Sequence, residues 1–335
     1  MKPDGKETKL SVRKSKSTLN VKPGEIAGEE FTVMLPHDIP LKFRWCPPGS
    51  FVMGEGRNER EVSLSNGFWI AEIETTGSTF FSSLLMARET EGRFNAVVGR
   101  IKLLDENAAK IPDMGAFLSK GLKAVVDDMS WFEAITVAQI FNAHFGMQEW
   151  EFRLPTAAEW EYACQAGDYS PENIDEIHKY AWLISNSPRK YSPHQAAQLI
   201  PNAWGLYDMR GNAEEWVMDW ADANEYDTEV MPHRAGTDPI GPRQGNQYTY
   251  HYNQQYKDEN PNKPTTKDFT FQGEMKLLKG GNFQNYGDRI LAKSQSRRPP
   301  DKSKPLDRVG FRLVLAPAID WAGLVPQPKK TEGQP

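Results

Sequence analysis

The residue types that most often do chemistry in proteins are few in this chain and lie far apart. The sequence has two cysteines, Cys46 and Cys164, and neither has a histidine close to it, so the ligand spacing of a zinc site is absent. The six histidines, at positions 37, 144, 178, 194, 233 and 251, are scattered and form no close pair on a helix. We therefore expect both cysteines to be small buried residues rather than reactive thiols or metal ligands.

One segment has the composition of a loop that holds a functional group at a fixed place, and we call it the presenting frame. Residues 277–300, LLKGGNFQNYGDRILAKSQSRRPP, contain a glycine pair near the start and an arginine pair near the end, and RVGFRLVLA follows from position 308. Such a segment is typical of a loop that holds a group at a fixed place. It contains no cysteine, no histidine and a single carboxylate, Asp288. The reactive group that the frame would present is therefore missing from the sequence.

The elements that must position this segment begin with strands. EFTVMLP and LKFRWCPPGSFVMG alternate apolar and polar residues, and a Pro-Pro-Gly turn lies within the second of them. EVSLSNGFWIAEIETT repeats the scheme around a Ser-Asn-Gly turn, and GSTFFSSLLMARET is typical of a short helix. The first third of the chain therefore predicts antiparallel strands followed by a helix.

Two further helices have clear start signals. Ser130 and Glu133 form a capping box, in which each side chain binds a backbone N–H group at the helix start, and Gly146 is expected to end this helix. Thr156 and Glu159 form a second capping box in LPTAAEWEYACQAG, whose closing glycine is expected to end that helix. These two helices are the most strongly predicted elements of the chain.

The rest of the domain lacks periodicity. Residues 168–275 are rich in Pro, Asn, Gly and aromatic residues, and we expect ordered coil held by aromatic anchors. Residues 90–125 are expected to form an irregular insertion. There is no internal repeat, so we predict one domain over residues 30–320, a disordered N-terminal arm over 1–29 and a disordered tail over 321–335.

Composition and charge exclude some classes of function. The chain has 335 residues and a formal net charge of -5, with both signs interspersed, so nucleic acid is not an expected partner. The longest apolar runs are far shorter than the roughly 20 residues that cross a bilayer. No export signal is visible, so the expected location is the cytoplasm, or outside it if the chain has lost a leader. The oligomeric state is not predicted.

Five motifs together resemble one known family. GSFVMG, FRLPTAAEWEYACQAG, NAWGLYDMRGNAEEW, LKGGNF and RVGFRL occur in the order seen in formylglycine-generating enzymes, also called sulfatase-modifying factors, between about residues 42 and 314. The resemblance implies an α+β fold of the C-type-lectin-like kind. Such a fold has a small twisted antiparallel sheet, two main helices and extensive irregular coil.

The resemblance also implies an activity whose metal ligands are absent here. Active members oxidise a cysteine of a client sulfatase to formylglycine with molecular oxygen and copper, which two cysteines of the enzyme hold. Aligned without gaps, those two positions are Asn285 and Ile290 in this chain. Copper(I) is a soft ion that selects sulfur ligands, so we expect no copper. A related group uses iron held by histidines, and the dispersed histidines here do not support that chemistry.

A structural calcium loop is a further implication of the resemblance. Carried over by position, Asp208 and Glu215 would supply side-chain oxygens, and Gly211 and Ala213 would supply backbone carbonyls. Calcium takes 6–8 oxygen ligands and suits an irregular loop. The alternative is that Asp208 caps a turn and that Glu215 is solvated.

A polar face would replace the copper site. It is expected to consist of Asn282, Gln284, Asn285, Tyr286, Asp288, Arg297 and Arg298. Amide, phenol and guanidinium groups suit hydrogen bonding to a polar ligand or peptide. The alternative is an ordinary surface.

Other residues of the motifs are expected to be structural. Arg312 is predicted to be a buried hydrogen-bond hub, and Trp204, Trp216 and Trp220 are predicted to anchor the core. The segment QGNQYTYHYNQQY, residues 244–256, has the tyrosine-rich composition of a recognition loop. It is equally typical of a surface loop whose rings pack against the coil.

Three functions remain open from the sequence. The preferred one is a non-catalytic scaffold or binding module for a polar ligand, a peptide or a partner protein. The first alternative is an oxidoreductase that converts a peptide cysteine or another thiol. The second is a variable receptor of a diversity-generating retroelement, in which residues 282–307 would vary.

Overall fold

The computed structural model describes most of the predicted domain. It covers residues 19–54, 59–89, 122–167, 174–188, 192–221, 236–243, 245, 248–256, 265–285, 295–300 and 308–324. For residues 88–89, 174–175, 248–256, 265–273, 295 and 297, the backbone alone is described. The predicted insertion at 90–125 lies outside the described residues except for 122–125.

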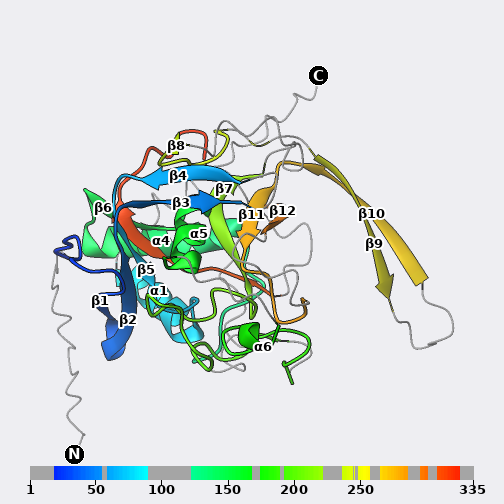
Figure 1. Cartoon of the computed structure of the whole chain (residues 1–335), viewed down its shortest axis with the longest axis horizontal. Helices are drawn as coiled ribbons and strands as arrows, with labels where there is room; N and C mark the ends of the chain where they lie inside the picture. The colour runs from blue at the N-terminus through cyan, green and yellow to red at the C-terminus, as the bar shows by residue number, and fades with distance from the viewer. Residues whose placement is uncertain are drawn as a thin grey trace, which may run out of the picture.

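A five-stranded antiparallel sheet forms the centre of the fold (Figure 1). Its order is β1-β2-β5-β14-β6, with bounds Glu30–Leu35, Ile39–Cys46, Phe68–Ala71, Val314–Pro317 and Trp150–Arg153. The predicted Pro-Pro-Gly turn follows β2 and the Ser-Asn-Gly turn precedes β5, and these two strands pair so that Trp45 of β2 lies opposite Trp69 of β5. The last strand, β14, is inserted between β5 and β6 and brings the two ends of the domain together.

The described residues form three smaller sheets besides the central one. One has the order β12-β11-β7-β13, with bounds Gln295–Arg298, Lys276–Lys279, Glu214–Trp220 and Val309–Gly310. A second has the order β3-β4-β8, with bounds Gly49–Met53, Arg60–Leu64 and Gly236–Thr237. The third is a two-stranded ribbon of β9, Tyr248–Tyr256, and β10, Thr265–Gly273. A short 3-10 helix, η1, spans Pro36–Asp38.

The helices begin where the capping boxes predict. Helix α4, Trp131–Phe145, begins at Ser130, whose hydroxyl accepts from the Glu133 N–H, and ends at Gly146 in the left-handed conformation. Helix α5, Ala157–Gln165, has the same box at Thr156 and Glu159, but its chain turns left-handed at Ala166, one residue before the predicted glycine. The described part also contains α1, Gly77–Glu89, and the short α6, Ile174–Ile177.

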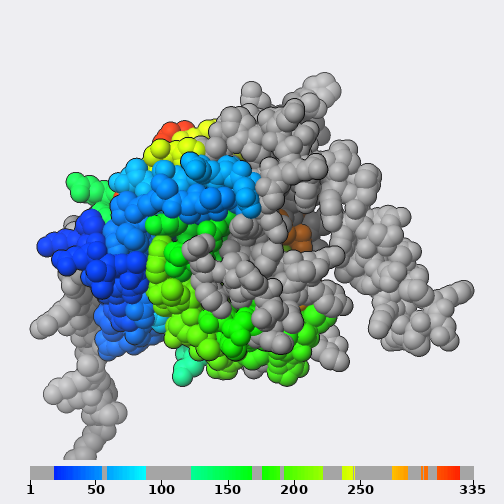
Figure 2. Space-filling model, viewed as in Figure 1, coloured from blue at the N-terminus to red at the C-terminus, as the bar shows by residue number. Residues whose placement is uncertain are grey.

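The central sheet separates two apolar cores. Trp69 and Ala71 of β5 face the core that contains α4, whereas Phe68 and Ile70 face the core that contains α5. Strands β3 and β4 lie across the α5 side of the fold (Figure 2). The predicted α+β architecture, with two main helices packed on a small antiparallel sheet, is confirmed.

The predicted coil over 168–275 contains strands that the sequence does not indicate. Strand β7 is buried along its whole length, so it lacks the alternation of apolar and polar residues that marks a half-buried strand. Three of its seven residues are acidic and are held by internal partners. For example, Asp219 accepts a hydrogen bond from the Ala157 N–H at 2.7 Å.

The packed region extends beyond residues 30–320 at both ends. Residues 19–29, predicted as part of an arm, lie against the sheet: the Gly28 N–H donates to the Trp45 carbonyl at 2.9 Å. At the other end, the fully buried Lys276 ammonium group donates to the Leu324 and Met218 carbonyls at 2.5 and 2.7 Å. Residues 1–18 and 325–335 lie outside the described residues. Among the helices described, none has the length and apolar character needed to cross a bilayer.

Candidate functional site

The loop that precedes β7 is held by a buried arginine. Both terminal arms of the Arg312 guanidinium are engaged: Nε and Nη2 donate to the two Glu215 oxygens at 2.7 and 2.6 Å, and Nη1 and Nη2 donate to the Ala71 and Tyr207 carbonyls at 3.1 and 3.0 Å. Neither Arg312 nor Glu215 is exposed. The Trp160 indole N–H also donates to Glu215, at 2.7 Å. The prediction that Arg312 is a buried hydrogen-bond hub is confirmed, and so is the burial of Trp204, Trp216 and Trp220.

A second carboxylate of this hub, Glu74, escaped the sequence analysis. It is fully buried, and its oxygens accept from the Asn212 side-chain amide at 2.8 Å and from the Ala213 N–H at 3.1 Å. Burial raises the pKa of Glu74 well above its ordinary value, and the nearby Asp208 and Glu215 raise it further. The sequence offered little signal for it, because Glu74 lies three residues after the buried strand β5, and Glu72, which is nearer to that strand, is only half-buried.

Asp208 is the third carboxylate. Its Oδ2 accepts from the Ala197 N–H at 2.7 Å, and its buried Oδ1 has no hydrogen-bond partner within the described part of the chain. Burial raises its pKa to about 6, against the lowering effects of the Ala197 hydrogen bond and of Arg312. Of the predicted alternative, the turn capped by Asp208 agrees with the Ala197 contact, whereas the solvated Glu215 is wrong, because Glu215 is fully buried.

One of the four predicted calcium ligands, Glu215, already has other partners. Both Glu215 oxygens are held by Arg312, and one of them also by Trp160. A Cβ atom added to Gly211 would lie only 2.1 Å from the Trp182 carbonyl oxygen, so no side chain fits at this position. The Gly211 N–H donates to the Gly280 carbonyl at 2.8 Å. Across the described residues, no group of three or more His, Cys, Asp or Glu side chains is arranged to hold a metal. A calcium ion would have to displace Arg312 from Glu215, so calcium binding stays a prediction.

The glycine pair starts a tight turn in the presenting segment. Gly280 and Gly281 both have positive φ angles, of 87° and 69°, which favour glycine. The following Phe283 is fully buried, and its N–H donates to the Asn212 carbonyl at 3.0 Å. The turn is therefore fixed to the loop that Arg312 holds.

The first residues of the predicted polar face are used inside this turn. The Asn282 side chain accepts from the Gln284 N–H at 2.9 Å, and the Asn285 side chain accepts from the Asn282 N–H at 2.7 Å. Asn282 is also buried. At position 285, where the family has a metal cysteine, the side chain thus stabilises the backbone. Tyr286, Asp288 and Ile290 lie outside the described residues.

The remaining polar residues gather beside β12. Ser296 donates to Glu214 at 2.7 Å, Arg298 lies 3.8 Å from the other Glu214 oxygen, and Arg308 donates to the Gln284 side chain. We call Glu214, Gln284, Ser296, Arg298 and Arg308 the polar cluster. The Arg298 side chain is 39% exposed. For Arg297, the position on β12 is described and the side chain is not.

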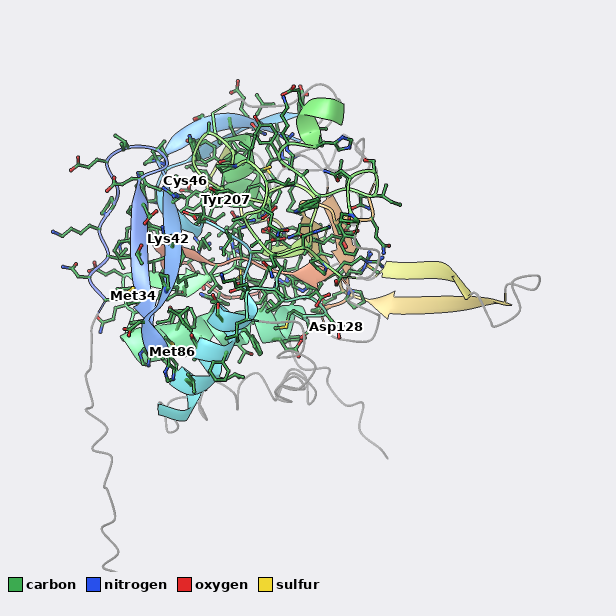
Figure 3. The ribbon with its side chains drawn as sticks, turned by 90° about the horizontal axis from the view of Figure 1, so that it is seen from below. Met34, Lys42, Cys46, Met86, Asp128 and Tyr207 are labelled. Atoms are coloured by element: carbon green, nitrogen blue, oxygen red, sulfur yellow. The ribbon has the colours of Figure 1, made fainter. Side chains whose placement is uncertain are left out.

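Both cysteines lie in the core that contains α5, as predicted. Cys46, labelled in Figure 3 at the end of β2, is fully buried, and Cys164 of α5 is buried as well. Burial raises the pKa of both thiols, and for Cys46 the nearby Glu159 adds to this effect. Because metals and substrates react with the thiolate, neither thiol is prepared for copper or for redox chemistry.

The motifs, the fold and the buried hub point to one family. A family model described as the sulfatase-modifying factor enzyme 1-like domain matches residues 40–317. The chain belongs to the sulfatase-modifying factor family. The sequence resemblance is therefore confirmed over most of the chain, and sulfatase-modifying factor folds are of the C-type-lectin-like kind.

Relatives of this sulfatase-modifying factor chain carry different names. It is 26% identical over 189 residues to a formylglycine-generating enzyme of Thermomonospora curvata, covering 49% of this chain and 50% of that protein. It is 33% identical over 221 residues to the serine/threonine-protein kinase Pkn1 of Chlamydia trachomatis, covering 63% of this chain and 32% of the kinase. The chain thus spans half or less of the length of these relatives.

A solved structure supports the fold alone. Treponema denticola variable protein 1 has a TM-score of 0.58 with 19% sequence identity, covering 86% of this chain and 99% of the other.

The polar cluster shows what sequence reasoning missed. Glu214, Ser296 and Arg308 were not among the predicted residues, because they come from β7, β12 and the start of the final signature. The pairing of β7 with β11 and of β11 with β12 brings Ser296 to Glu214, and the pairing of β13 with β7 brings Arg308 to Glu214. The signal available was the acidic pair at the start of β7, Glu214 and Glu215.

Proposed function

We propose that this protein is a non-catalytic sulfatase-modifying factor that binds a polar ligand or a peptide of a partner protein at the polar cluster. The main support for the proposal is that the loops which would hold a copper site are present, whereas the cysteines that would bind the copper are absent. The glycine turn, the Arg312 hub and the final signature are all in place. The side chain at position 285 is an amide that holds the turn, and the only two thiols of the chain are buried.

The chemistry of the polar cluster supports binding. Arg298 and Arg308 carry planar guanidinium groups, which suit bidentate hydrogen bonds to a carboxylate. Glu214 and Ser296 add an acceptor and a hydroxyl, so the cluster offers both donors and acceptors. Strand β12 is the last strand of its sheet in the described order, and a peptide that pairs with such an edge gains backbone hydrogen bonds.

The alternatives rest on weaker support. An oxidoreductase acting on a peptide cysteine would need a thiolate or another redox group that the polar cluster does not offer. A variable receptor would place its variation within residues 282–307, and the likeness to the Treponema variable protein reaches only the level of the fold. Sequences of near relatives would test it: substitutions concentrated between 282 and 307 are the result that favours a receptor. The cytoplasmic location likewise stays a prediction.

A binding screen tests the proposal. We expect the purified chain to retain at least one class of probe on arrays of acidic, basic and neutral peptides and of glycans, with acidic probes preferred. Replacing Arg298→Ala should weaken that binding about tenfold or more, because a hydrogen bond to a charged group contributes about 1.5–3 kcal/mol. The affinity is measured by titration calorimetry with the retained probe.

A matched arginine serves as the control. Arg243 is exposed, and its side chain donates to the Asp320 and Ala322 carbonyls rather than to a residue of the polar cluster. Arg243→Ala should leave the affinity unchanged. No binding on any array, or an equal loss in the Arg243 and Arg298 variants, would contradict the proposal.

A further inference from the structure

The ribbon of β9 and β10 stands away from the rest of the fold. Figures 1 and 3 show it projecting from the body in two perpendicular views. Within the described part of the chain, its two strands pair with each other and with no third strand. An isolated two-stranded ribbon is at best marginally stable in water. This ribbon therefore needs a surface to cover it.

The register places every aromatic residue of the ribbon on one face. Tyr252 is paired with Phe269 and Tyr250 with Phe271, and paired residues share a face. Since alternate residues share a face as well, the full set on this aromatic face is Tyr248, Tyr250, Tyr252, Gln254, Tyr256, Thr265, Lys267, Phe269, Phe271 and Gly273. The other face consists of Thr249, His251, Asn253, Gln255, Thr266, Asp268, Thr270 and Gln272.

Residues 244–256 were predicted to be a loop, either for recognition or packed against the coil. From residue 248 the segment is a strand instead. A ribbon with one aromatic and one polar face has the pattern of a sheet with one covered and one solvated side.

We propose that the aromatic face pairs with the same face of a second copy of this chain. Six aromatic residues can contribute roughly 900 Å² of contact area, which is of the order of the about 800 Å² per partner that a stable interface buries. A face of this size is rarely left open on a monomer. A two-fold axis makes the same patch complementary to itself, which is the commonest arrangement in soluble oligomers.

Charge selects the orientation of the two ribbons. Lys267 is the only charged residue on the aromatic face. It lies two positions from Phe269, the centre of β10, so in an antiparallel arrangement the two lysines are about 14 Å apart along the ribbon. That separation exceeds the screening length of about 8 Å at physiological salt. A parallel arrangement would place both lysines at the same end, so the antiparallel dimer is favoured.

Sedimentation velocity of the full chain over a concentration series tests the dimer. We expect the unmodified chain to form a dimer. The double variant Tyr250→Ser with Phe271→Ser removes a cross-strand pair of the aromatic face from both copies, and it should raise the dissociation constant at least about a hundredfold. The matched control, His251→Ser with Thr270→Ser, changes the pair on the opposite face and should stay within about threefold of the unmodified chain.

Two further measurements separate loss of the interface from loss of folding. All ten tryptophans lie outside the ribbon, so tryptophan fluorescence reports the thermal unfolding of the body, which should not change in either double variant. Phe269→Cys places a thiol on the expected two-fold axis and should form a disulfide-linked dimer on oxidation, whereas Thr270→Cys should not. A chain that is monomeric at every concentration, an aromatic-face variant that dimerises as before, or equal cross-linking of both cysteine variants would overturn the proposal.

Discussion

Replacing Arg312→Leu should cost about 3–5 kcal/mol of unfolding free energy at pH 7.5, the usual cost of removing one partner from a buried ion pair. The reason is that Glu215, fully buried, would lose the guanidinium that engages both of its oxygens. Asp208 and Glu74 lie in the same hub and would lose the same positive charge. Urea unfolding followed by tryptophan fluorescence measures the change.

Two further measurements separate the loss of the Arg312 charge from the loss of its packing: the pH dependence of the unfolding free energy and the variant Arg312→Lys. The cost should shrink towards pH 5, because burial raises the pKa of Glu74 and of Asp208, and protonation of these two groups removes negative charge from the hub. Arg312→Lys keeps the charge but not the bidentate geometry, so its cost should be intermediate. Arg298→Leu, at an ion pair that is partly exposed, should cost less than about 1 kcal/mol. A cost for Arg312→Leu that equals that of Arg298→Leu, or that does not vary with pH, would show that the hub does not hold the loop.

Asp208→Asn is expected to stabilise the fold at neutral and alkaline pH. The pKa of Asp208 is raised from 3.8 to about 6, so the folded state keeps a proton that the unfolded state has lost. Stability therefore falls as the pH rises from about 4 to 6, and above that window the loss is roughly 3 kcal/mol. Asparagine is neutral, tolerates the left-handed backbone and keeps an oxygen for the Ala197 N–H. Part of the loss should therefore be recovered.

The measurement is the unfolding free energy of both chains at pH 4.5 and pH 8. We expect a gain of about 1–2 kcal/mol for Asp208→Asn at pH 8 and little change at pH 4.5. The same experiment tests the calcium prediction: if the loop binds an ion, calcium should raise the melting temperature of the unmodified chain and a chelator should lower it, and no shift with either would remove the prediction. A calcium-dependent rise that Asp208→Asn abolishes would mean that the ion displaces Arg312 and that the predicted calcium loop exists.

Short sequence motifs correctly predicted the elements whose stabilising contacts are between residues close in the sequence. The capping boxes at Ser130 and Thr156 depend on residues three positions apart, so the sequence alone was sufficient to place the starts of α4 and α5. Arg312 was predicted from its place in the RVGFRL motif, which resembles the signature of the family. Strand β7 was not predicted, because its acidic residues are satisfied by partners that are distant in the sequence.

Only the site residues that are close together in the sequence could be predicted. Asn282, Gln284 and Asn285 were predicted as a ligand face, but Asn282 and Asn285 hold the turn through backbone hydrogen bonds. Glu214 joins the polar cluster through strand pairing, and Glu74 joins the hub across more than a hundred residues of sequence. Such non-local contacts leave no periodic signal in the sequence.

The most direct test of the account is an oxidation assay. The chain is incubated with copper(I), oxygen and a sulfatase-type cysteine peptide, next to an active formylglycine-generating enzyme, and the peptide mass is followed. The account predicts that this chain leaves the cysteine peptide unchanged while the active enzyme converts it. Loss of the thiol with formation of an aldehyde by this chain would contradict the proposal that the chain binds a ligand without catalysing oxidation.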